Sequence, residues 1–146
     1  MKFTELNLEP SLIASLDRLT ITDCTPIQEK ALPLTLEGKD IAGLAQTGTG
    51  KTAAFALPIL QRLIEEPGRG PLVLVLAPTR ELAVQIDAEF RRLARYTTIK
   101  TATIFGGVSP RVQVEALCKR PEIVIGCPGR VLDLIQQRAF DPSFVD

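Results

Sequence analysis

Apolar and polar residues follow two rhythms along the chain. Short apolar runs occur at four places, and after each run apolar residues recur at helical spacing. The runs DIAGLA, LVLVLA, TATIF and EIVIGC predict strands at 40–45, 72–77, 101–105 and 122–127. The second and fourth runs are apolar on both alternations, which is typical of strands buried on both faces of a sheet.

The stretches between these runs predict helices. Four follow the predicted strands and two precede the first, and they occupy 50–64, 79–96, 111–119, 130–138, 10–19 and 26–37. In the longest stretch we expect the apolar face to consist of Leu82, Ile86, Ala88, Leu93 and Tyr96. Alternating strands and helices predict an α/β fold, with a mostly parallel sheet and helices on both faces.

Composition narrows the classes of function. The 146 residues suffice for one compact domain, and 45% of them are hydrophobic, which argues against disorder. Seventeen basic and seventeen acidic residues give no net charge, so there is no global electrostatic case for nucleic-acid binding. Histidine is absent, which excludes Ser-His and Cys-His catalysis. Three cysteines without metal-ligand spacing predict a reducing, cytoplasmic location, and no signal peptide or membrane-spanning run is expected.

The stretch AQTGTGKT is the strongest candidate site. It follows a predicted strand and opens a predicted helix, which is the context of a phosphate-binding loop. Gly48 and Gly50 let the backbone turn so that N–H groups point inward, and the helix start adds a positive dipole end. We expect Lys51 to reach the β- and γ-phosphates and Thr52 to place its hydroxyl on a magnesium ion. Ala45 stands where the general pattern has Gly, and a glycine-rich turn without a ligand is the alternative.

Other short motifs narrow the choice of family. TPIQ precedes the loop, FTELNL begins at Phe3, and PTRELA, GG and CPGR each follow a predicted strand. In this order and spacing the set strongly resembles DEAD-box ATP-dependent RNA helicases, from Phe3 to about Phe140. The resemblance implies that residues 1–146 form part of the first of two RecA-like domains, with a Q-motif region at 1–29.

The resemblance also implies a nucleotide site for ATP with Mg²⁺. Gln28 corresponds to the adenine-reading glutamine, because an amide offers the donor and acceptor that match the adenine edge. Phe3 corresponds to the upstream aromatic that stacks on the base. The remaining implied contacts are Thr25 and the loop residues Ala45, Gln46, Thr47, Gly48, Thr49, Gly50, Lys51 and Thr52. The alternatives are a surface glutamine and a phenylalanine that packs an N-terminal arm. Thr20, Ile21 and Cys24 depart from the Gly-Phe and Pro of the family pattern.

The motifs that follow the later strands correspond to the family's RNA contacts. These residues are Pro78, Thr79, Arg80, Gly106, Gly107, Pro128, Gly129 and Arg130. Glycine N–H groups and arginines bind phosphates, so we expect contacts to the RNA backbone with little base specificity. Cys127 replaces the usual Thr, which removes a hydroxyl contact. Tight turns and helix caps are the alternative explanation for each residue.

A magnesium-bound triphosphate also needs a carboxylate at the end of a buried strand. None of the predicted strands after the loop ends in Asp or Glu. In the family this acid belongs to an Asp-Glu-Ala-Asp motif on the next strand, so we expect that the chain is truncated just before it. By analogy that strand would neighbour the loop strand, and its absence predicts poor stability or self-association.

Three functions remain open at this point. The first is the N-terminal part of an RNA helicase, which remodels short RNA duplexes only when the missing second domain closes on ATP and RNA. The second is a non-catalytic fragment that binds nucleotide or RNA. The third is another P-loop NTPase, which fits the loop but leaves PTRELA, GG and CPGR unexplained together.

Overall fold

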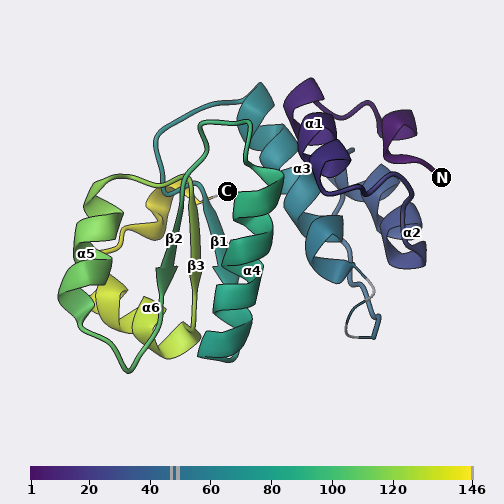
Figure 1. Ribbon diagram of the computed structural model, residues 1–146. Helices are drawn as coiled ribbons and strands as arrows, with labels where there is room; N and C mark the ends of the chain where they lie inside the picture. Colours follow the sequence, from purple (N-terminus) through teal and green to yellow (C-terminus); the bar gives the residue numbers. More distant parts are fainter. Residues whose placement is uncertain (47, 49, 146) are drawn as a thin grey trace. The chain divides into compact units, whose positions relative to one another are not determined.

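The chain divides into two compact units. The computed structural model describes residues 1–46, 48 and 50–145. Unit 1 comprises Met1–Pro67 and Arg92–Thr98, and unit 2 comprises Gly68–Arg91 and Ile99–Asp146. The first unit is helical, and the second contains the sheet (Figure 1).

Unit 1 is built around α3. Its elements are a 3-10 helix at Phe3–Leu6, α1 (Pro10–Arg18), α2 (Pro26–Thr35) and α3 (Lys51–Glu65). Both α1 and α2 contact α3 (Figure 1), and each begins with a proline, whose missing N–H costs nothing at that position. The backbone N–H of Glu9 donates to Gln61 Oε1 on α3 at 2.8 Å. The three helices predicted in this region are therefore confirmed, with ends that differ by one or two residues.

The strand predicted at 40–45 is wrong. These residues are irregular, and Leu44 is 99% exposed. A strand is stable only when its backbone N–H and C=O groups pair with a neighbouring strand. Within the described residues, no strand pairs with this segment. The apolar pattern of a segment does not show whether a neighbouring strand is available to pair with it.

Unit 2 contains a small sheet of three parallel strands. They are β1 (Val73–Leu76), β2 (Thr101–Ile104) and β3 (Ile123–Gly126), and their spatial order is β1-β3-β2. The central strand β3 pairs with both neighbours, with Ile123 opposite Val73 on one side and Thr101 on the other. The carboxyl ends of all three strands consequently lie at one edge of the sheet.

Helices cover both faces of this sheet, as the sequence predicts. One face packs against α5 (Pro110–Cys118) and α6 (Pro128–Gln136), while α4 (Arg80–Leu93) lies on the other (Figure 1). The first core contains Ile104, Leu117, Val124, Val131, Leu134 and Phe140. A short 3-10 helix at Pro142–Phe144 ends the unit.

The buried stripe of α4 differs from the expected one. Ala83, Ile86, Phe90 and Leu93 are buried, whereas Leu82 and Tyr96 are 37% and 49% exposed. The observed spacing of three, four and three residues is regular for a helix, and it passes through the small Ala83. Ile86 and Leu93 of the predicted face are therefore confirmed. The prediction was wrong in including the exposed Ala88 and in omitting the buried Phe90.

The strands differ in how deeply they are buried. Ile123, Val124 and Ile125 of β3 are fully buried, which confirms the prediction for the central strand. Strand β1 is only partly buried, and Leu76 is 55% exposed, so the same prediction for β1 is wrong. Strand β1 lies at the edge of the order β1-β3-β2, and an edge strand has a neighbour on one side only.

The helices of the described residues are short. The longest, α3, has 15 residues, whereas about 20 apolar residues are needed to span a bilayer. No helix in this part of the chain is long and apolar enough to cross a membrane.

Candidate functional site

The predicted phosphate loop leads directly into α3 of unit 1. Gly48 and Gly50 have positive φ angles of 83° and 84°, which favour glycine, and Gly50 is the residue that caps α3. Lys51 and Thr52 are the first two residues of the helix, and Lys51 is exposed while Thr52 is half-buried. The predicted contacts at Thr47 and Thr49 lie outside the described residues.

Gln28 contacts this loop. Its amide nitrogen donates to the carbonyl oxygen of Gly50 at 3.1 Å, and its amide oxygen accepts from the N–H of Thr25 at 2.9 Å. The side chain is 4% exposed, so Gln28 is not a surface glutamine. An amide carries two N–H bonds and two lone pairs, which leaves one donor and one acceptor for a base edge. Adenine reading at Gln28 stays a prediction, and the structure adds that this residue ties α2 to the loop.

Thr25 and Phe3 lie in the same unit. Thr25 Oγ1 is buried and has no hydrogen-bond partner among the described residues. Phe3 is 2% exposed, and its N–H donates to the carbonyl of Thr22 at 3.2 Å. The buried ring favours the packing role that was the alternative for Phe3. Stacking on a base would require the ring to move outward.

The residues of unit 1 fit a triphosphate. A Cβ placed on Gly48 would meet nothing within 4 Å, so the loop has open space there. The N–H groups at the start of α3 and the exposed Lys51 ammonium are groups that bind a polar anionic ligand. For magnesium, Thr52 offers one hydroxyl oxygen. Within the described residues no cluster of three or more Asp, Glu, Cys or His could hold a metal ion.

Ala45, Gln46 and Cys24 complete the sequence-predicted surroundings of the loop. Ala45 is half-buried and Gln46 is exposed. Cys24 stands where the family pattern has Pro, and burial raises the pKa of its thiol. The neutral thiol is therefore favoured, and Cys24 N–H donates to the carbonyl of Met1 at 2.9 Å in a structural role.

The predicted RNA contacts all lie in unit 2, at the carboxyl ends of its strands. Three segments lie there: residues 78–80, which lead from β1 into α4, the turn with residues 106–107 after β2, and residues 128–130, the first turn of α6 after β3. Every one of these residues except Arg130 is exposed. The parallel sheet therefore brings the three motifs to one edge, where open α/β sheets bind ligands.

The first of these segments presents an arginine. Thr79 Oγ1 accepts from the N–H of Leu82 at 3.2 Å and so caps α4. The exposed Arg80 guanidinium lies over the ring of Phe105, 4.9 Å from its centroid. This cation–π contact holds the charge beside the second segment, since a Cβ on Gly107 would lie 3.8 Å from Arg80 Nη1.

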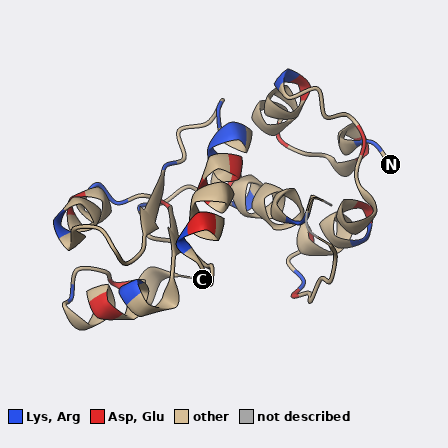
Figure 2. Ribbon diagram, turned by 60° about the horizontal axis from the view of Figure 1, so that its bottom comes forward, with Lys and Arg blue, Asp and Glu red and all other residues tan. Residues whose placement is uncertain are grey.

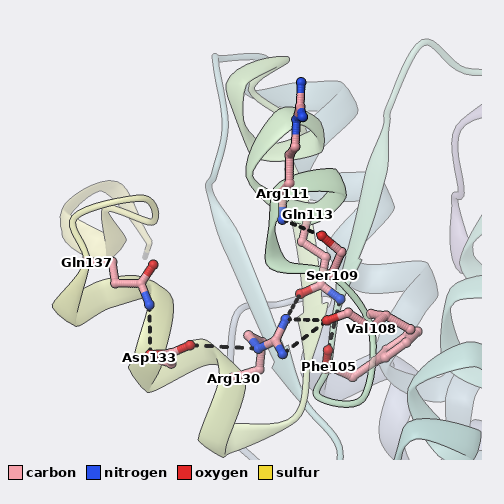
Figure 3. Close-up of polar contacts among 8 residues, drawn as sticks. All are labelled: Phe105, Val108, Ser109, Arg111, Gln113, Arg130, Asp133 and Gln137. Carbon is pink, nitrogen blue, oxygen red and sulfur yellow. Dashed lines mark hydrogen bonds and ion pairs between the residues drawn. The ribbon is translucent and has the colours of Figure 1, made fainter.

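The third segment directs its arginine inward. Arg130 donates through Nη1 and Nη2 to the carbonyl of Val108, both at 3.3 Å, and through Nη1 to Gln113 Oε1 at 3.0 Å (Figure 3). Its Nε lies 3.8 Å from Asp133 Oδ2, and the side chain is 13% exposed. Gln113 was not predicted as a site residue. The sequence feature that could have identified Gln113 is its position four residues before Leu117, on the buried side of α5. A polar side chain in a buried position needs a hydrogen-bond partner.

Charge is distributed evenly over the rest of the molecule. Lys or Arg and Asp or Glu occur together on the helices of both units (Figure 2). Positive potential for an anionic ligand is consequently local. Among the predicted site residues, Lys51 in unit 1 and Arg80 in unit 2 carry exposed positive charges.

Comparisons with known proteins agree with the motifs. The family model described as DEAD/DEAH box helicase matches residues 25–144. The chain is 49% identical over 139 residues to the DEAD-box ATP-dependent RNA helicase CshA of Streptococcus pneumoniae, covering 95% of this chain and 26% of that protein. It is also 49% identical to the ATP-dependent rRNA helicase RRP3 of Meyerozyma guilliermondii, covering 92% of this chain and 28% of that protein.

A solved structure is similar as well. The RNA-helicase Prp28 from Chaetomium thermophilum, crystallised with ADP, matches with a TM-score of 0.90 and 40% identity, covering 99% of this chain and 36% of that one. The chain thus spans between a quarter and two fifths of the length of these three relatives.

Proposed function

Because the chain belongs to the DEAD/DEAH box helicase family, we propose that it is the N-terminal part of an ATP-dependent RNA helicase. In this proposal unit 1 binds ATP and unit 2 binds the RNA backbone. The complete protein, with a second RecA-like domain, remodels short RNA duplexes in the cytoplasm. The observation that carries the proposal is the tie between Gln28 and Gly50, which joins the predicted adenine reader to the phosphate loop.

The residues of unit 1 have defined parts in this proposal. The Gly48–Gly50 backbone and the start of α3 hold the phosphates, and Lys51 neutralises their charge. Thr52 would hold Mg²⁺ through its hydroxyl oxygen, and the ion would neutralise part of the triphosphate charge when bound. The remaining donor and acceptor of the Gln28 amide select adenine over guanine, whose O6 acceptor mismatches.

The residues of unit 2 read the strand by its backbone. Gly106 and Gly107 offer N–H groups, and Arg80 offers a guanidinium, so the contacts carry little base specificity. Catalysis requires a carboxylate for the magnesium ion, which we expect from an Asp-Glu-Ala-Asp motif in a longer chain. We therefore propose that residues 1–146 alone do not hydrolyse ATP.

The decisive experiment compares RNA-stimulated ATP hydrolysis by this chain and by a C-terminally extended chain. We expect turnover only in the extended protein, and we expect Lys51→Ala to abolish it, since removing one charged phosphate contact costs roughly 2–4 kcal/mol of transition-state stabilisation. Hydrolysis by the short chain that disappears with Lys51→Ala would contradict the proposed need for the further acid. Turnover of the extended protein that ignores RNA would favour another P-loop NTPase.

The edge strand β1 leads to a proposal about the association of this chain with itself. Strand β1 pairs only with β3 among the described strands, and it contains four apolar residues without a charge or proline. Such an edge invites pairing with another chain, so we propose that this chain self-associates. Sedimentation of a stable monomer at high protein concentration would exclude this.

A further inference from the structure

Gln113 is a buried polar residue that the proposed function does not use. It lies on α5 of unit 2, and its side chain is 5% exposed. Its amide nitrogen donates to the carbonyl of Phe105 at 2.9 Å, and its amide oxygen accepts from Arg130 Nη1 at 3.0 Å (Figure 3). Both ends of one side chain are therefore committed to the two turns that follow β2 and β3.

Arg130 completes the same network from the other side. Its two terminal nitrogens hold the carbonyl of Val108, and its Nε faces Asp133. A guanidinium has five N–H bonds, so most of its donors point into the protein. An exposed arginine such as Arg80 can meet a phosphate without losing such bonds, whereas Arg130 would have to break them.

The network fixes the turn at both ends. The carbonyl of Phe105 is held by Gln113 and the carbonyl of Val108 by Arg130, and Gly106 and Gly107 lie between them. Both glycines are exposed, and neither N–H has an acceptor within the described part of the chain. With both flanking carbonyls held by side chains, the N–H groups of Gly106 and Gly107, which are unpaired in the described chain, are donors that an anion can use.

We propose that Gln113 is a positioning residue for RNA binding, which acts with Arg130 to hold the Gly106 and Gly107 N–H groups toward the RNA phosphates. Arg130 then serves as an internal brace and does not contact the RNA. This inference rests on the proposed RNA-binding function of unit 2.

The test is equilibrium binding of the whole chain to a fluorescein-labelled single-stranded oligouridylate over a series of salt concentrations. Gln113→Met keeps the length of the side chain and removes both strong hydrogen bonds. We expect this substitution to weaken RNA binding roughly five- to tenfold, because the hydrogen bonds that order the turn are lost. Gln136→Met, at an exposed position of α6, is the matched control and leaves the affinity unchanged.

The salt dependence separates positioning from contact. Loss of one phosphate contact lowers the slope of log affinity against log salt by about 0.7 for a single strand. We expect this drop for Arg80→Met and not for Gln113→Met or Arg130→Met. We further expect the double variant of Gln113 and Arg130 to bind like the weaker single variant, because both residues act on one turn.

Each outcome decides something different. No RNA binding by the unaltered chain would defeat the proposed function itself. Binding that survives Gln113→Met unchanged, a slope that falls with Arg130→Met, or additive losses in the double variant would each overturn the inference. If Gln113→Met fails to fold, Gln113→Glu retains the bond to Arg130 and loses the one to Phe105. An intermediate loss is then expected, and unchanged affinity in that variant contradicts the proposal.

Discussion

Two glycine-rich turns in this chain have the same predicted task, phosphate binding, and they are held in different ways. The turn that contains Gly106 follows β2, whose backbone is paired with β3, and two side chains brace it. The turn that contains Gly48 and Gly50 follows residues 40–46, which have no strand partner among the described residues. A buried amide, that of Gln28, connects this turn to α2 of unit 1 through a hydrogen bond to the carbonyl of Gly50.

The difference indicates where each turn gets its shape. The end of a paired strand is held by backbone hydrogen bonds to its neighbour, so side chains need only orient the turn that follows it. Among the described residues, the phosphate loop follows no paired strand, so its glycine conformations and the buried Gln28 amide contribute to its shape. We therefore expect the same kind of glycine substitution to cost more in the loop of unit 1 than in the turn of unit 2.

The largest effect is expected for Gly50→Ala. Its φ of 84° is unfavourable for any residue with a Cβ, at a cost of roughly 1–2 kcal/mol. The new Cβ would also clash with Gln28 Nε2 and displace the side chain that donates to the carbonyl of Gly50. A total of about 2–4 kcal/mol is expected. Urea unfolding followed by circular dichroism measures it, and affinity for a fluorescent ATP analogue should fall in parallel.

Gly48→Ala is the matched control for that variant. Its φ is nearly the same, at 83°, but a Cβ there meets nothing within 4 Å. Only the conformational cost of roughly 1–2 kcal/mol should appear. Equal losses at both glycines would mean that the tie from Gln28 contributes nothing to the loop.

The contrast between the two turns also explains how far the sequence could predict the molecule. The helices followed from apolar periodicity and from prolines at their starts, both of which are local signals. Strand 40–45 failed because a strand depends on a neighbour distant in sequence, which its own residues do not specify. The same reason explains β1, whose apolar pattern fits a central strand although it lies at the edge.

The sequence predicted which residues belong to the candidate site, but it did not predict the hydrogen bonds between them. Gly50 and Gln28 stand 22 residues apart, and the motifs name both without indicating the hydrogen bond between them. Arg130 is part of a motif, yet its inward direction depends on Gln113 and on the carbonyl of Val108, which no motif marks. Side-chain partners are set by tertiary packing, so only the structure reveals them.

A smaller effect is expected in the turn of unit 2. Gly107 has a φ of 85°, and a Cβ there would make ordinary contact with Arg80 Nη1 at 3.8 Å. Gly107→Ala should therefore cost roughly 1–2 kcal/mol of unfolding free energy from strain alone. Urea unfolding provides the value for direct comparison with Gly50→Ala. A loss larger than that of Gly50→Ala would reverse the proposed order of the two turns.

Gly106→Ala is the control in this turn. Gly106 does not have a positive φ, and a Cβ there meets nothing within 4 Å. The substitution should be neutral or stabilise the fold by about 0.4–1 kcal/mol, because alanine restricts the unfolded chain. Marked destabilisation would show that the turn is held more tightly than the hydrogen bonds of Gln113 and Arg130 imply.

The smallest expected effect is a change of stability with pH, which has opposite directions in the two units. In unit 1 a hydrogen bond to Glu29 raises the pKa of the N-terminal amine above its ordinary value of 8.0, whereas in unit 2 the Ser143 N–H lowers the pKa of Asp141. A raised amine pKa contributes stability that is fully present below pH 8.0 and is lost as the pH rises through the folded value. A lowered carboxyl pKa contributes stability above its ordinary value that is lost in acid.

Glu29→Gln tests the alkaline side. The variant should melt slightly below the unaltered chain at about pH 7, and the difference should shrink by about pH 10, where the free amine is neutral in both proteins. Asp141→Asn is the control, since its difference should be present and constant over this range and should disappear only in acid. The ion pair between Met1 and Glu29 is largely solvated, so added salt should reduce the effect further. A melting difference for Glu29→Gln that does not change with pH would mean that Glu29 stabilises unit 1 by packing or helix position and not through the charge of the amine.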